Sequence, residues 1–162
     1  MKKILSGFIV GILSLTLGGC GQPRVPSEQL VYSEVVKHKE KADDAYELSK
    51  MWLAQAFNDS KAVLEYSNKK NHTIMGKGIL TQVHYGTIVF MDTRFTIKIE
   101  TKDNKSKITL SDMVQKSSFK DVRDFKMWNI ESLNYFITRA KPMIAEYAKY
   151  MNKTETAAKS DW

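Results

Sequence analysis

The spacing of hydrophobic and polar positions changes along the chain, and each change marks a predicted element. Residues 30–36 are rich in β-branched and aromatic side chains between polar runs, which predicts a strand. Between 43 and 57 apolar residues recur every three or four positions, which predicts a helix. The expected buried face of this helix is formed by Ala45, Leu48, Ser49, Trp52, Leu53 and Ala56.

Four extended segments follow this helix, at residues 61–67, 72–83, 85–101 and 106–114. Turn-prone residues lie between them, most clearly at 68–71 and 102–105. Because successive strands with short links pair side by side, we expect an antiparallel meander. Phe95, Ile97 and Ile99 alternate with polar residues, so one face of that strand should meet the core and the other should meet water.

A second helix is predicted from about Ile130 to Met151, with Asn129 as its N-cap. Pro142 lies inside this pattern and should kink the helix without splitting it, because the apolar stripe keeps its phase across the proline. The polar residues 152–162 predict a disordered tail. The expected buried stripe consists of Leu133, Ile137, Ala140, Ile144, Ala148 and Met151.

The elements together predict one α+β domain over residues 30–151. It should contain an antiparallel sheet of about five strands and two packed helices, in the order β-α-β-β-β-β-α. Gly76 and Gly78 within the second of the four extended segments predict a bulge or a close backbone contact. The composition, 43% hydrophobic and 27% charged, is that of one ordinary globular domain. A chain of 162 residues is too short for an enzyme with a separate cofactor module.

The first 19 residues have the three parts of a secretory signal. Lys2 and Lys3 are followed by an apolar stretch from Ile4 to Leu17, which is shorter than the ~20 residues that cross a bilayer. The stretch ends in Leu17-Gly18-Gly19-Cys20, which resembles the lipobox of bacterial lipoproteins. The resemblance implies that Cys20 is diacylated on sulfur and becomes the first residue of the mature protein.

The rest of the chain is consistent with a lipid anchor. Cys20 is the only cysteine, so it has no partner for an internal disulfide. Two or more acyl chains would attach the protein durably to a membrane, and residues 20–29 would form a flexible tether of up to ~30 Å. Gly21 in place of Asp favours the periplasmic face of the outer membrane if the host is Gram-negative. The net charge of +7 falls to +5 when Lys2 and Lys3 leave with the signal, so the mature protein is mildly basic.

Three segments resemble one family of bacterial envelope proteins. They are Tyr46–Leu53 in the first helix, the run Phe57–Leu64 that follows it, and Ile74–Gly78 with its two glycines. They resemble the DUF4468 family, and the likeness covers roughly residues 30–114 and more loosely the last helix. The resemblance implies a TBP-like fold. The family name records an unassigned function, so it supplies no catalytic residues, and the fold does not imply DNA binding.

The residues that carry chemistry do not form a recognisable catalytic or metal-binding pattern. The three histidines, His38, His72 and His84, are widely spaced, and we interpret them as ordinary surface or half-buried side chains. Asp43 and Asp44 are best explained as favourable charges in the first turn of a helix. We therefore predict no enzyme activity, no metal and no cofactor.

The connection between the last long strand and the last helix, residues 115–129, mixes cations with aromatic side chains. The simplest interpretation is a loop whose aromatic residues complete the core. The other interpretation is a surface that contacts anionic lipid or an envelope partner, whereas an exported protein rarely meets nucleic acid. The candidate interaction surface is formed by Lys120, Arg123, Phe125, Lys126 and Trp128.

The sequence thus predicts a lipid-anchored protein of the cell envelope that acts as a non-enzymatic binding module. Its expected partners are the membrane, through the acyl chains on Cys20, and an envelope protein. The alternative is a small periplasmic enzyme or small-ligand carrier that uses a pocket between the sheet and the helices. An immunity or exclusion role would be one form of the first function, and no residue selects it.

Overall fold

The computed structural model describes residues 26, 29–57, 63–84, 89–117, 125–126 and 130–157. The predicted order of elements is confirmed, with one additional two-residue strand before the last helix. The elements are β1 (Tyr32–Lys37), α1 (Ala42–Ala56), β2 (Val63–Asn68), β3 (Thr73–His84), β4 (Val89–Lys102), β5 (Lys105–Ser117), β6 (Phe125–Lys126) and α2 (Ile130–Ala157).

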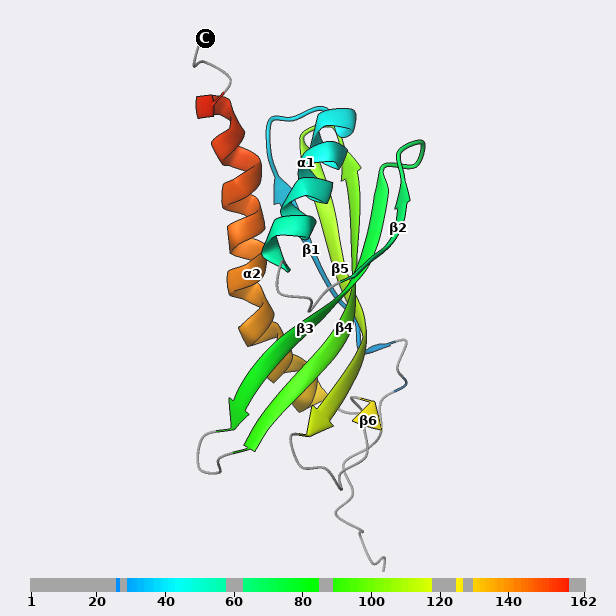
Figure 1. Cartoon of the computed structure of the whole chain (residues 1–162), viewed down its shortest axis with the longest axis vertical. Helices are drawn as coiled ribbons and strands as arrows, with labels where there is room; N and C mark the ends of the chain where they lie inside the picture. The colour runs from blue at the N-terminus through cyan, green and yellow to red at the C-terminus, as the bar shows by residue number, and fades with distance from the viewer. Residues whose placement is uncertain are drawn as a thin grey trace, which may run out of the picture.

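The strands form one antiparallel sheet in the order β1-β5-β4-β3-β2, as Figure 1 shows. The predicted meander is confirmed for β2 to β5, and β1 pairs with the last strand of that meander. The first six residues of β5 pair with β1, and β6 pairs with β5 further along at Val114 and Gln115. Part of the 115–129 connection is therefore strand and not loop, because the long β5 extends past β1 and offers unpaired backbone groups there.

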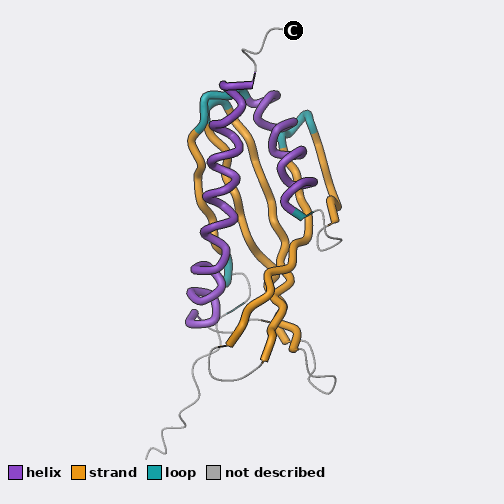
Figure 2. The backbone as a smooth tube through the Cα atoms, turned by 60° about the vertical axis from the view of Figure 1, so that its left-hand side comes forward, coloured by secondary structure: helices purple, strands orange, loops and turns teal. Residues whose placement is uncertain are grey.

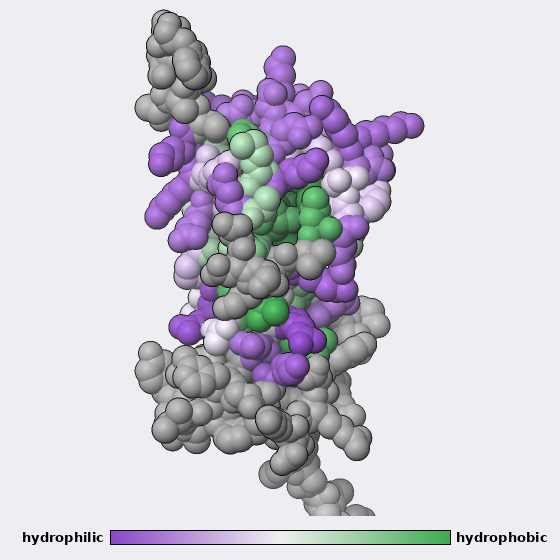
Figure 3. All heavy atoms as spheres, viewed as in Figure 1, coloured by the Kyte–Doolittle hydropathy of each residue, from purple (hydrophilic) through white to green (hydrophobic). Residues whose placement is uncertain are grey.

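Both helices lie on the same face of the sheet (Figures 1 and 2). The core fills the space between them and contains inward-facing residues of β3, β4 and β5, including Ile74, Phe95 and Ile108. On the face seen in Figure 3, hydrophilic side chains surround a more hydrophobic centre. The molecule thus has two layers, as expected for an antiparallel sheet that buries one side only.

The buried face of α1 differs in detail from the periodicity that predicted it. Ala45, Ser49, Trp52 and Leu53 are buried as expected, and Tyr46 joins them, whereas Leu48 is half-buried and Ala56 is exposed. The difference arises because α1 packs against β3, β4 and α2 together. Contact from two directions rotates and widens the buried face beyond a single helical stripe.

Helix α2 continues unbroken through Pro142, whose side chain is exposed. The helix therefore is not split, in agreement with the sequence prediction. Its fully buried side chains include Phe136 and Tyr147, whereas Ile137 and Ala148 of the predicted stripe are only partly buried. The ring of Tyr147 packs against Trp52 of α1, and the ring of Phe136 packs against Phe95 of β4.

The last helix ends later than predicted. It runs to Ala157, so residues 152–157 of the expected disordered tail are helical. The side-chain amide of Asn152 donates to the carbonyl oxygen of Ala148 at 2.7 Å and lies 3.4 Å from the carbonyl oxygen of Lys37. These contacts hold the C-terminal part of α2 against the end of β1.

The two glycines of β3 have the roles that their positions predicted. Gly76 lies opposite a register shift in β2, between Leu64 and Tyr66, which is a β-bulge. Gly78 faces two aromatic rings, and a Cβ atom there would lie 2.6 Å from Cζ of Phe95 and 2.9 Å from Cε1 of Phe57. Only a residue without a side chain fits at Gly78 without displacing a ring.

A two-residue turn, Asp103–Asn104, joins β4 to β5 and is bound to the start of α1. Asn104 adopts a φ of 64°, which asparagine tolerates better than most residues. Its backbone N–H donates to the carbonyl oxygen of Glu40 at 2.9 Å, and the backbone N–H of Ala42 donates to Oδ1 of Asp103 at 2.9 Å. Because Lys41 at the N-cap makes no capping side-chain hydrogen bond, Asp103 supplies the cap from a distant part of the chain.

Candidate functional site

The face of the sheet opposite the helices carries the candidate site. Within the described residues, no helix or strand covers this face over β1, β5 and β4 (Figures 1 and 2). A hollow of about 380 Å³ lies on it, near the β4–β5 turn. The hollow is lined by Val35, Glu100, Lys102, Lys105 and Lys107.

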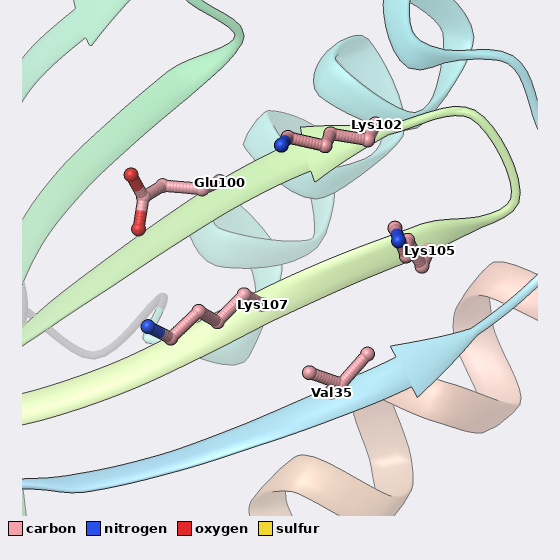
Figure 4. Close-up of a pocket in the computed structure, with 5 residues that line it drawn as sticks. All are labelled: Val35, Glu100, Lys102, Lys105 and Lys107. Carbon is pink, nitrogen blue, oxygen red and sulfur yellow. The ribbon is translucent and has the colours of Figure 1, made fainter.

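The register of the strands places these lysines next to one another on the outer face of the sheet. Lys102 and Lys105 flank the two-residue turn and therefore lie directly opposite each other, and Lys37 of β1 lies opposite Lys105 on the other side. In the next outward-facing row, Lys107 lies between Val35 and Glu100. Figure 4 shows the side chains on the viewer's side of the sheet, with the helices behind it.

The hollow has a net positive charge. Its one acidic side chain, Glu100, forms an ion pair of 2.8 Å with Lys98. In the part of the chain that the structure describes, Lys102, Lys105 and Lys107 form no ion pair. Like charges directly opposite each other in a sheet are unfavourable, so this row of lysines weakens the hairpin that carries it.

A buried polar network lies on the helix side of the same strands. Ser106 points inward between two outward-facing lysines of β5, and its Oγ is 2.9 Å from Nε2 of His38. The hydroxyl groups of Ser49 and Tyr147 are 2.7 Å apart, and Ser49 also donates to the carbonyl oxygen of Ala45 at 2.6 Å. These polar side chains are shielded from water and join β5 to both helices, so we interpret the network as structural.

Burial changes the protonation of two members of this network. It lowers the pKa of His38, although the nearby negative charge of Glu40 acts in the opposite direction. It raises the pKa of Tyr147, and the hydrogen bonds with Ser106 and Ser49 partly offset that rise. Both shifts favour the neutral side chain, as expected in an interior. His38 is therefore a buried histidine, and the prediction of a surface or half-buried side chain was wrong for this residue, because it packs against Ser106 of β5.

The other two histidines lie at opposite ends of the same strand, since His72 directly precedes β3 and His84 ends it, and the structure does not bring them together. Nε2 of His72 is 2.8 Å from Oδ1 of Asp43, and this hydrogen bond lowers the pKa of the Asp43 carboxyl. Asp43 is an acidic residue in the first turn of α1, as predicted, and also has this partner from a distant strand end. His84 is the last residue of β3, and its side chain is not described.

Several sequence-predicted site residues cannot be placed. Cys20 and three members of the candidate interaction surface, Lys120, Arg123 and Trp128, lie outside the described residues. Phe125 and Lys126 are described only as the backbone of β6. Among the residues that are described, no three His, Cys, Asp or Glu side chains form a metal-binding group. None of the described helices is long and apolar enough to span a bilayer.

The family model described as a domain of unknown function (DUF4468) with TBP-like fold matches residues 32–116, from the start of β1 to the last but one residue of β5. The chain belongs to the DUF4468 family. The match includes the strands that line the hollow, so the hollow lies within the DUF4468 domain.

Among the solved structures that match the chain, two illustrate the similarity in fold. A DUF4468 family protein from Bacteroides ovatus is 12% identical, with a TM-score of 0.59, and the match covers 75% of this chain and 85% of that one. A TBP-like protein from Parabacteroides distasonis is 17% identical, with a TM-score of 0.51, and the match covers 59% and 64% of the two chains. No curated protein matches the chain. The TBP-like fold expected from the sequence is confirmed.

Sequence reasoning did not identify the lysine hollow. A signal for it was present, because Lys102 and Lys105 are the first and last residues of the predicted turn 102–105, and Lys107 follows two residues later. However, lysines at alternate positions are also typical of the solvent-exposed face of any amphipathic strand. The contribution of Val35 required knowledge that β1 pairs with β5, which is separated from it by three other strands in the chain order.

Proposed function

We propose that this DUF4468 protein is anchored to the cell envelope by lipid on Cys20 and acts there as a non-enzymatic binding module. The anchor is supported by the lipobox-like run Leu17-Gly18-Gly19-Cys20 and by the short apolar segment before it. The binding role is supported by one main observation. The sheet presents an uncovered face with a positively charged hollow.

The geometry favours binding on the open face over a pocket between the sheet and the helices. That interface is filled by large side chains, among which Phe95, Phe136 and Tyr147 are at most 1% exposed. The ring centroids of Phe95 and Phe136 are 5.3 Å apart. A ligand between the layers would have to displace this packed core, at a cost comparable to a large core substitution. The open face requires no such rearrangement.

The anchor is tested by labelling cells with a radioactive fatty acid and recovering the protein. The wild-type protein should carry the label, and Cys20→Ala should carry none. Ser6→Ala changes the same leader without touching the lipobox and should be labelled like the wild type. Labelling of Cys20→Ala at the wild-type level would overturn the anchoring part of the proposal.

The binding face is tested by placing a photocrosslinking amino acid at Val35 in one variant and at Met51 in another. Both positions are similarly exposed, at 55% and 53%, but Val35 lies on the open sheet face and Met51 on α1. After irradiation of intact cells, position 35 should give discrete adducts that position 51 does not give. Equal adduct patterns from the two positions, or no adduct at position 35, would contradict binding by the open face.

A further inference from the structure

We propose that the hollow on the open sheet face binds a phosphate monoester, a group with close to two negative charges at neutral pH. This inference rests on the proposed function, because it names the ligand chemistry of the same face. The hollow combines three lysines from β4 and β5 with Val35 from β1. Its volume of about 380 Å³ is in the range of small-ligand sites.

Positive charges from three adjacent strands gather at the hollow. The row Lys37, Lys105 and Lys102 places three cations directly opposite one another on adjacent strands, and Lys107 adds a fourth in the next row. The tight turn keeps Lys102 and Lys105 together, so the chain cannot separate them without losing the hairpin register. A bound dianion would convert this repulsion into attraction. Glu100 does not cancel the charge, because Lys98 is its ion-pair partner.

The cations that line the hollow are all lysines, and none is an arginine. Arginine pairs with carboxylates and phosphates alike through two parallel hydrogen bonds, whereas lysine acts as a point charge with three donors and no fixed plane. Several converging point charges favour a phosphate monoester over a carboxylate, because the phosphate carries about −1.5 to −2 charges at neutral pH. The lysine stems and Val35 form an apolar floor that can carry the organic part of the ester.

The test is a titration of the isotope-labelled full-length protein, in a neutral detergent, with glycerol 3-phosphate as the probe. Amide signals of Val35, Lys105 and Lys107 should shift in a saturable manner. The double variant Lys105→Gln/Lys107→Gln should raise the dissociation constant at least about tenfold, because it removes two charge-assisted contacts. Both side chains are exposed, so the variant should retain the wild-type amide spectrum away from the hollow.

The matched control is Lys69→Gln/Lys77→Gln, which removes the same charge from two exposed lysines paired with Glu47 and Glu65. This control should bind glycerol 3-phosphate within about twofold of the wild type, because neither Lys69 nor Lys77 lines the hollow. Equal weakening in the two double variants would show a general charge effect and overturn the site. Absence of saturable shifts in the wild type would overturn it as well.

A second titration distinguishes the source of the phosphate. Dihexanoyl phosphatidic acid, used as dispersed monomers, presents the same phosphate monoester on a lipid. Tighter binding than glycerol 3-phosphate would assign the hollow to a lipid headgroup, and equal binding would assign it to a free phosphate ester. These titrations do not depend on anchoring or on a protein partner. Failure here, with fatty-acid labelling and position-35 adducts intact, would reject the phosphate site and leave the proposed function standing.

Discussion

Gly78 gives the sharpest test of the packing between the sheet and α1. Replacement by alanine adds one methyl group, whose carbon would lie 2.6 Å from Cζ of Phe95 and 2.9 Å from Cε1 of Phe57. Ordinary carbon contacts are about 3.5–4.0 Å, so the methyl group overlaps Phe95 by roughly 1 Å. Gly78 does not have a left-handed φ, so the penalty is steric and does not come from the backbone.

The neighbouring rings limit how far Phe95 can move. Phe95 is 1% exposed, and its ring centroid is 5.3 Å from that of Phe136 and 6.4 Å from that of Phe57. Overpacking of such a site costs about 1–3 kcal/mol. Alanine also restricts the unfolded chain, which returns about 0.4–1 kcal/mol. We therefore expect Gly78→Ala to lower the free energy of unfolding by about 1–2 kcal/mol and the melting temperature by about 3–10 °C.

The assay is chemical denaturation followed by tryptophan fluorescence, because Trp52 is buried and its ring centroid is 6.3 Å from that of Phe57. Phe95→Leu removes the atoms that the new methyl group would meet. In the double variant Gly78→Ala/Phe95→Leu, the alanine should therefore cost at least about 0.5 kcal/mol less than it does alone. Unchanged or increased stability of Gly78→Ala, or strictly additive effects in the double variant, would refute the proposed steric conflict.

Three further predictions concern the cap, the buried histidine and the lysine row. Asp103→Ala should lower the free energy of unfolding by about 1 kcal/mol, because it removes the side chain that caps the N–H of Ala42. Asp103→Asn should lower the free energy of unfolding less. Equal losses for the two variants in urea denaturation would contradict the cap. Burial lowers the pKa of His38 from 6.5, so the unfolded state takes up a proton first as the pH falls. The urea midpoint should thus fall from pH 7.5 to pH 5.5, and His38→Gln should reduce that fall; an equal fall in the variant would exclude His38 as its cause. Lys105→Gln should raise the free energy of unfolding at low salt by about 0.2–1 kcal/mol, with a smaller gain in high salt, and a loss of stability would show that the lysines do not repel each other.

Much of the fold followed from local patterns. The order of strands and helices, the α1 boundaries within one residue and the meander from β2 to β5 were all predicted. These features are readable because burial of one face imposes a period of two on a strand and about 3.6 on a helix. The glycines of β3 were also informative, since a missing side chain in a strand marks a bulge or a close contact.

The details of the core depended on how the elements pack together. Phe136 and Tyr147 are buried more deeply than Ile137 and Ala148, although all four fit a helical stripe. Which of these four side chains are buried most deeply depends on the position of α1 beside α2. The hydrophobic periodicity of α2 carries no information on that position. The extension of α2 to Ala157 likewise involves Asn152 and the end of β1, which are far apart in the sequence.

The sequence by itself determined the class of fold and the family resemblance. It is also the sole basis for the proposed lipid anchor at Cys20. The tertiary structure decided which charged side chains lie next to one another. The pairing of β1 with β5 brings Val35 beside Lys107, and the Asp103–Asn104 turn both opposes Lys102 to Lys105 and caps α1. The physical reason is that hydrophobic periodicity records which side of an element faces the core. The convergence of like charges on the outer side depends on strand register and on contacts between distant segments.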